Sequence, residues 1–114
     1  MHLKNFSLIY PVDDMVKFAP AYDLLATRLL IPEKDDPEEM ALTINGRKRK
    51  LNKGDFLSLA NNLGLQEKQI TNVFKRFSSA LPEARAAIEN GFLPENKRKE
   101  YQQLLEERAG RLRL

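Results

Sequence analysis

The sequence lacks several residue types that would each bring a chemistry of their own. Its 114 residues include no cysteine and no tryptophan, and His2 is the single histidine. The absence of cysteine excludes disulfide scaffolds, thiolate zinc sites and cysteine nucleophiles. One histidine gives no independent support to a catalytic triad or to a metal site built from several histidines.

Long apolar runs and glycine-rich loops are missing as well. No stretch approaches the roughly 18 consecutive apolar residues of a membrane span, and the first residues lack the apolar core and cleavage site of a secretory signal. Because there is no glycine-rich phosphate loop, a complete nucleotide site cannot be built from this chain. We therefore expect a cytoplasmic protein with no membrane partner.

The charge balance and the length set the next limits. Lysine and arginine number 19 against 16 aspartate and glutamate residues, which leaves a net charge of +3. This small excess permits a nucleic-acid partner without requiring one. The length suits one modest domain and is too short for an enzyme with a cleft between two lobes. We predict a single domain over residues 1–114, with an irregular β region at 1–51 and a helical region at 52–114.

A β-hairpin is predicted near the N-terminus. The run Phe6–Tyr10 is apolar and β-prone and stops at Pro11, and residues 16–19 alternate before Pro20. Two aspartates at 13–14 mark the turn between these runs.

Less regular structure is expected up to residue 51. Residues 22–30 favour a short helix or an irregular buried stretch, and the charged segment 33–39 reads as a solvated loop. Residues 40–44 alternate at period two before Asn45 and Gly46, the strongest two-residue turn signal. A short strand that enters a tight turn is therefore predicted.

From residue 52 the apolar period becomes helical. Asn52 can cap a helix that ends at Gly64, with Asp55 in its first turn. A second helix carries apolar residues at the spacing of a buried stripe, namely Ile70, Val73, Phe74, Phe77 and Leu81. Pro82 is expected to interrupt it before a short segment that ends at Asn90 and Gly91, and a last helix begins near Pro94. The predicted fold class is mainly α with a small β-hairpin region.

The first two helices could form a DNA-binding helix-turn-helix. Ala60, Gly64 and Ile70 stand at the places where that motif needs a small residue, a turn and an apolar anchor. The second helix would then offer side chains suited to base edges and phosphates: Gln66, Lys68, Gln69, Asn72, Lys75 and Arg76. The competing interpretation is structural, since any two helices joined by a short glycine turn share these features. The basic run 46–50 has the same two interpretations, a phosphate-binding segment or a solvated turn.

The opening motifs resemble those of a known family. Residues 2–10 (HLKNFSLIY) and 18–27 (FAPAYDLLAT) closely resemble the catalytic-loop and metal-aspartate region of HipA-family serine/threonine kinases, the toxins of bacterial toxin–antitoxin pairs. The resemblance continues through residues 40–46 and 55–60. It implies the helical C-lobe of a HipA-like kinase, with ATP and magnesium as cofactors and a protein substrate. A HipB-like antitoxin and operator DNA are the implied partners.

The resemblance also assigns roles to particular residues. It implies that Asn5 and Asp23 are the magnesium ligands and that His2, Lys4 and Tyr22 lie near the nucleotide. A kinase holds magnesium between the ATP phosphates and two protein oxygen ligands, and a hairpin would bring Asn5 and Asp23 together. From the residues alone, Asn5 would be a turn residue and Asp23 a helix cap.

One departure from the family pattern bears on activity. The catalytic aspartate of the family stands two places before the histidine, so it would fall just before Met1. The glycine-rich loop, the ATP-binding lysine and the N-terminal lobe also lie upstream in this family. We therefore expect this chain to be the C-terminal part of a kinase C-lobe, from a truncated or split gene, an internal start or an isolated domain, and to be inactive alone. Another chain could supply the N-terminal kinase part. The alternatives are a helix-turn-helix-like DNA-binding or antitoxin-interaction module, and a helical interaction domain with no activity.

Overall fold

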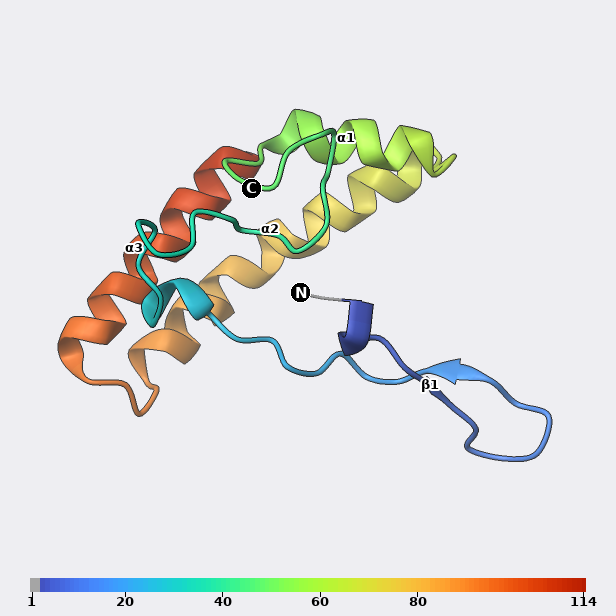
Figure 1. The fold of residues 1–114 in the computed structure, drawn as a ribbon, viewed down its shortest axis with the longest axis horizontal. Helices are drawn as coiled ribbons and strands as arrows, with labels where there is room; N and C mark the ends of the chain where they lie inside the picture. Colours follow the sequence, from blue (N-terminus) through green and yellow to red (C-terminus); the bar gives the residue numbers. More distant parts are fainter. Residues whose placement is uncertain (1–2) are drawn as a thin grey trace.

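The computed structural model describes residues 3–114, and helices account for about half of the chain (Figure 1). The elements in chain order are a 3-10 turn η1 (Leu3–Asn5), strands β1 (Leu8–Ile9) and β2 (Lys17–Phe18), a 3-10 turn η2 (Thr27–Leu29), and helices α1 (Lys53–Asn62), α2 (Glu67–Glu89) and α3 (Glu95–Leu112). The prediction of a mainly α fold with a small β-hairpin is confirmed.

The hairpin is present and extends away from the helices (Figure 1). β1 and β2 pair antiparallel, with Leu8 opposite Phe18 and Ile9 opposite Lys17. The amide of Ala19 continues the ladder by donating to the Ser7 carbonyl at 2.9 Å. Because the hairpin projects, the radius of gyration is 16.3 Å, compared with about 13 Å for a compact domain of this length.

α1 begins and ends at the residues that the sequence indicates. The Asn52 side chain accepts hydrogen bonds from the amides of Gly54 and Asp55, and the Asp55 carboxylate accepts one from the Asn52 amide. This reciprocal capping box satisfies amides that have no partner inside the helix. The chain leaves α1 at Leu63, and Gly64 follows with a φ of +69°.

α2 corrects the prediction of a break at Pro82. The helix runs without interruption from Glu67 to Glu89, with Pro82 inside it. Proline removes one hydrogen bond, the one to the Ser78 carbonyl, and the remaining bonds of the helix persist. Packing on α3 offsets that loss, because Ile88 is buried and Gln102 of α3 donates to the Arg85 carbonyl at 3.1 Å.

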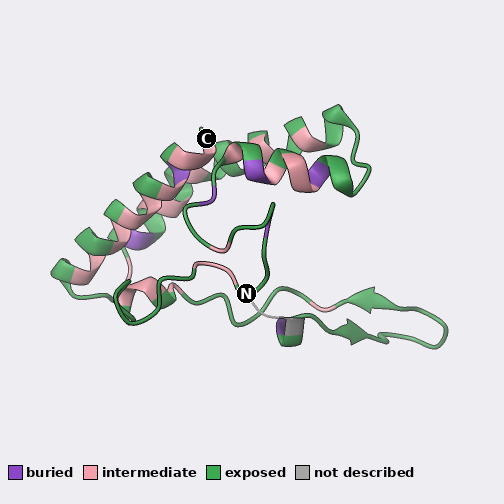
Figure 2. Cartoon of the chain, turned by 45° about the horizontal axis from the view of Figure 1, so that its top comes forward, coloured by how far each residue is buried: buried purple, intermediate pink, exposed green. Residues whose placement is uncertain are grey.

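α2 and α3 lie side by side and antiparallel (Figure 1). The Arg85 guanidinium binds both carboxylate oxygens of Glu106, at 2.6 and 3.0 Å. Arg98 donates to the Glu89 carbonyl at 2.7 Å, near the end of α2. α3 starts at Glu95, next to the predicted Pro94. Most of the ribbon is exposed or half-buried, and the buried residues lie at isolated points where elements meet (Figure 2).

The segment between the hairpin and α1 contacts α3 without forming a sheet. Glu39 makes ion pairs with Arg108 and Arg111, and the Lys97 ammonium donates to the Leu29 carbonyl at 3.1 Å. These contacts join residues about 70 positions apart and hold the segment against the helix.

One expectation for this segment is wrong and a second is met only in part. The predicted strand at 40–44 reduces to one bridge between Ile44 and Arg47, which flank the predicted Asn45–Gly46 turn. Alternation favours a strand only where a neighbouring strand can pair, and no such strand lies beside this segment within residues 3–114. The 22–30 stretch is also largely exposed, and only η2 is regular within it.

The stripe predicted to be buried on α2 is only partly covered. Ile70, Phe74 and Leu81 are half-buried, whereas Val73 is 48% and Phe77 63% exposed. The spacing predicted the face correctly, but within residues 3–114 nothing covers its centre.

Candidate functional site

Asn5 and Asp23 meet at the base of the hairpin. Asn5 closes η1 just before β1, and Asp23 follows β2, so the antiparallel pairing brings the two positions together. The Asn5 amide nitrogen donates to Asp23 Oδ2 at 2.7 Å. Asn5 is buried, with 7% of its surface exposed, whereas Asp23 is exposed. The predicted juxtaposition is confirmed, and the role of the pair as metal ligands stays a prediction.

Tyr22 links the segment after β2 to the segment before β1, next to Asn5 and Asp23. Its hydroxyl donates to the Lys4 carbonyl at 3.1 Å and lies 2.6 Å from Ser7 Oγ. Because the phenol has a single proton, Ser7 is then the donor to Tyr22. Tyr22 therefore positions the backbone on both sides of Asn5. No motif singles out Ser7; the hairpin register, which places Ser7 beside Ala19, is the signal that could have identified it.

The backbone at Asp23 adopts an uncommon conformation. Its φ is +54°, in the left-handed region that aspartate tolerates better than most residues. The expectation from residues alone that Asp23 caps a helix is wrong, since η2 begins later, at Thr27. The remaining predicted nucleotide contacts are Lys4, which is exposed beside Asn5, and His2, which lies outside the described residues.

The donor chemistry of this pair suits magnesium. A carboxylate and a side-chain amide offer hard oxygen ligands, and magnesium in proteins is usually bound by one or two protein groups together with phosphates and water. Across residues 3–114, no group of three or more histidine, cysteine, aspartate or glutamate side chains could hold a metal. A cation at Asn5 and Asp23 would therefore need further ligands from phosphate and water.

The residues predicted to contact DNA lie elsewhere, at the start and along the first half of α2. All six are exposed. Gln69 has a structural task, since its side chain accepts a hydrogen bond from the Gln66 amide at 2.8 Å. Ala60 is buried and Ile70 half-buried, as the helix-turn-helix interpretation requires, but the structural interpretation requires the same.

The basic run 47–50 follows the turn at Asn45 and Gly46. Lys48 pairs with Glu38 at 3.0 Å, and Arg47 lies close enough to Asp55 to act on its charge. A hydrogen bond from Asn45 to Asp55, at 3.0 Å, is the largest cause of a lowered pKa for the Asp55 carboxyl, followed by the bond from the Asn52 amide. The run is thereby tied to the start of α1.

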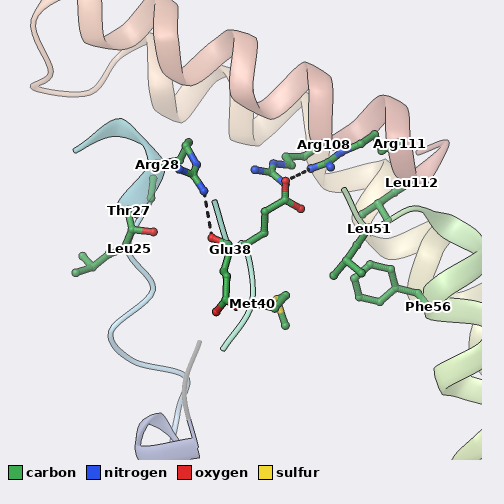
Figure 3. A pocket seen from close by; sticks show the side chains of 12 residues that line it. Leu25, Thr27, Arg28, Glu38, Met40, Leu51, Phe56, Arg108, Arg111 and Leu112 are labelled. Carbon is green, nitrogen blue, oxygen red and sulfur yellow. Dashed lines mark hydrogen bonds and ion pairs between the residues drawn. The ribbon is translucent and has the colours of Figure 1, made fainter. Parts of the chain in front are cut away.

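A hollow of about 290 Å³ lies between α3 and the loop segments around residues 25–28 and 38–40 (Figure 3). Its three arginines contact the protein itself, because Arg108 and Arg111 bind Glu39 and Arg28 donates to the carbonyls of Asp36 and Glu38, although Arg111 Nε is buried without a hydrogen-bond partner among residues 3–114. No sequence pattern predicts this cluster, because its members are distant along the chain. Its contacts brace the loop, so we assign it a structural role.

Comparison with known proteins identifies the family of this chain. The model for the HipA-like C-terminal domain matches residues 1–85, a range that includes both Asn5 and Asp23. The chain belongs to the HipA-like C-terminal domain family. A protein of Sinorhizobium fredii (strain NBRC 101917 / NGR234) named "Putative kinase Y4dM" is 40% identical over 72 residues. That match covers 61% of this HipA-like chain and 17% of the relative's length.

Two further findings concern the helices. The matched range ends inside α2, so α3 lies beyond it. Within the described part of the chain, no helix has both the length and the apolar character needed to cross a bilayer.

Proposed function

We propose that this chain contributes the metal-binding segment of a HipA-like serine/threonine protein kinase that acts in the cytoplasm. The single observation that carries this proposal is the 2.7 Å contact between Asn5 and Asp23 across the base of the hairpin. Family membership and the kinase name of the relative support the reaction class. When bound, magnesium would neutralise charge on the ATP phosphates during transfer to a serine or threonine of a protein substrate.

The chain's own residues would then hold and orient the metal site. Asn5 and Asp23 supply the oxygen ligands, and Tyr22 fixes the arms that carry them. His2 and Lys4 would lie toward the nucleotide. By the same family argument, the partner is a HipB-like antitoxin in a toxin–antitoxin pair.

We propose further that these 114 residues alone do not transfer phosphate. They contain no glycine-rich phosphate loop. In kinases, positioning and charge stabilisation supply nearly all of the catalysis, and the family's glycine-rich loop, ATP-binding lysine and catalytic aspartate, which share in both, lie in other parts of its proteins. Activity would require the N-terminal kinase part that the family's proteins carry.

A chimera tests the metal role. Residues 1–114 replace the corresponding segment of a full-length HipA-like kinase, and ATP-dependent phosphorylation is measured at varied magnesium concentration. We expect transfer in the chimera and a loss of at least about 100-fold in Asp23→Ala, because a ligand of the catalytic cation is gone. Asp13→Ala, in the exposed hairpin turn, is the matched control. Full activity of Asp23→Ala would show that this carboxylate is not a ligand.

The isolated chain tests the proposed inactivity separately. Calorimetric titration with Mg-ATP should give no saturable signal. A clear binding isotherm that Asp23→Ala abolishes would contradict this proposal while supporting the metal site.

One alternative function is kept because all six predicted DNA contacts on α2 are exposed, and Lys68, Lys75 and Arg76 have no ion pair within residues 3–114. We propose a gel-shift assay on duplex DNA at low and moderate salt, where phosphate contacts should weaken as salt rises. Absence of binding to any duplex at low salt would eliminate this function.

A further inference from the structure

An apolar groove of about 390 Å³ lies between α1, the first half of α2 and the C-terminal residues. Figure 1 shows α1 beside the start of α2, with the C-terminus near the start of α1. The α2 wall of the groove consists of Ile70, Val73, Phe74 and Phe77. Leu63, from the end of α1, is 66% exposed at its edge, and Val73 and Phe77 are also open to solvent. This surface differs from scattered exposed residues because its apolar side chains are contiguous.

Four cations surround the groove. Lys53, Lys75 and Arg113 line a hollow that shares Ile70 and Phe74 with it. Arg76 lines a second hollow, which shares Val73 and Phe77. The Lys53 ammonium stands 4.6 Å from the centre of the Phe74 ring. Glu83 is the single acidic residue that lines either hollow.

The pairing of cations differs sharply between this region and α3. Within residues 3–114, none of Lys53, Lys75, Arg76 and Arg113 has a carboxylate within ion-pair distance. By contrast, α3 carries five cations that each pair with a carboxylate: Lys97, Arg98, Lys99, Arg108 and Arg111. Four cations without an ion pair within residues 3–114 therefore surround this apolar groove, whereas others, such as Arg49, lie away from it.

We propose that this groove binds an acidic amphipathic helix of a partner protein. The apolar wall from Ile70 to Phe77 follows the i, i+3, i+4, i+7 pattern and is about 10 Å long, which matches two turns of a helix. Leucine-type side chains of the partner would fill the groove, and carboxylates beside them would meet the four cations.

The same features disfavour other occupants. A second copy in a two-fold dimer would bring the same unpaired cations against one another, which costs free energy. Duplex DNA could meet Lys75 and Arg76, but its phosphates would leave the apolar wall at Val73 and Phe77 without an apolar contact. A helix that is both apolar and acidic complements both parts of the surface.

A designed peptide tests this proposal with the intact chain. The probe is a fluorescein-labelled peptide of about 14 residues, with leucines at i, i+3, i+4 and i+7 and glutamates beside them. A scrambled peptide of identical composition is its control. Fluorescence anisotropy should show saturable binding that weakens as salt rises, and the scrambled peptide should bind at least about tenfold more weakly.

Matched variants locate the binding surface. Phe77→Ser and Arg76→Glu should each weaken peptide binding by at least about tenfold. Phe92→Ser and Arg49→Glu change a phenylalanine that is more exposed than Phe77 and an arginine without an ion pair within residues 3–114, both away from the groove, and they should leave the affinity unchanged. Far-UV circular dichroism checks folding, and Arg76→Glu tests the surface without altering its apolar wall.

Several results would overturn the proposal. These are no saturable binding, equal binding of the scrambled peptide, or equal losses in the control variants. Sedimentation that reveals a dimer abolished by Phe77→Ser would assign the groove to a second copy. Tighter binding of duplex DNA or of phosphatidylserine vesicles, lost in the same two variants, would assign the surface to a nucleic acid or a membrane.

Discussion

Replacing Pro82 with alanine should stabilise the fold, because α2 is continuous through a residue that cannot complete its hydrogen bonding. An alanine amide could donate to the Ser78 carbonyl four residues earlier. That hydrogen bond contributes about 0.5–1.5 kcal/mol net, and the full preference for alanine over proline in a helix interior is about 3 kcal/mol. Both Ser78 and Pro82 are exposed, so water already satisfies part of the demand of the carbonyl. We therefore expect a gain of about 1–3 kcal/mol.

Thermal and urea unfolding followed by circular dichroism measure this gain. For a chain of this length, the gain corresponds to a rise in Tm of about 4–12 °C. Ser79→Ala, at a neighbouring exposed helical position, should change stability by no more than about 0.5 kcal/mol.

An unchanged or lower Tm for Pro82→Ala would refute the reasoning. It would mean that the proline sets the direction of the helix at the point where the half that lines the groove meets the half that packs on α3. The hydrogen bond would then be regained only by moving the two halves out of alignment.

Two further predictions concern the start of α1. Asn52→Ala removes the acceptor for the Gly54 and Asp55 amides, and it should lower the free energy of unfolding by about 1 kcal/mol in urea titrations, whereas no change would show that solvent caps the helix equally well. The pKa of Asp55 lies below its ordinary value of 3.8, chiefly through the hydrogen bond from Asn45, so the unfolded chain binds a proton more readily than the folded one. The stabilisation from Asp55 should therefore be complete above pH 3.8 and fall as the pH drops below that value, and urea midpoints in this range should fall less steeply for Asp55→Asn.

The sequence predicted best where structure is local. The hairpin follows from apolar runs bounded by prolines, and the limits of α1 follow from Asn52 and Gly64, because a cap and a left-handed residue act within one turn. The meeting of Asn5 and Asp23 follows from the hairpin, since antiparallel pairing brings together positions on either side of it. Their proposed role depends on the family resemblance, because an asparagine and an aspartate alone do not specify a metal site.

The errors arose where tertiary contacts decide the outcome. Pro82 predicts a break by local propensity, but packing of the second half of α2 on α3 keeps the helix continuous. Residues 40–44 alternate like a strand and lack a partner strand within the described range. The bond of Tyr22 to Ser7 and the ion pairs of Glu39 join residues whose proximity no periodic pattern encodes.

The position of α3 explains how the HipA-like segment is held. The family match ends at residue 85, inside α2, so α3 lies beyond the range that the family model describes. Yet Glu39 of the loop forms ion pairs with α3, and the Leu29 carbonyl of η2 accepts a hydrogen bond from α3. Ile88, near the end of α2, is buried where α2 packs on α3. Through these contacts, α3 holds the loop and α2 in place, and the cations that it uses are Lys97, Arg108 and Arg111. Cations near the start of α2, such as Lys75 and Arg76, have no ion pair within residues 3–114, so the cations that hold the structure together differ from those of the proposed binding groove.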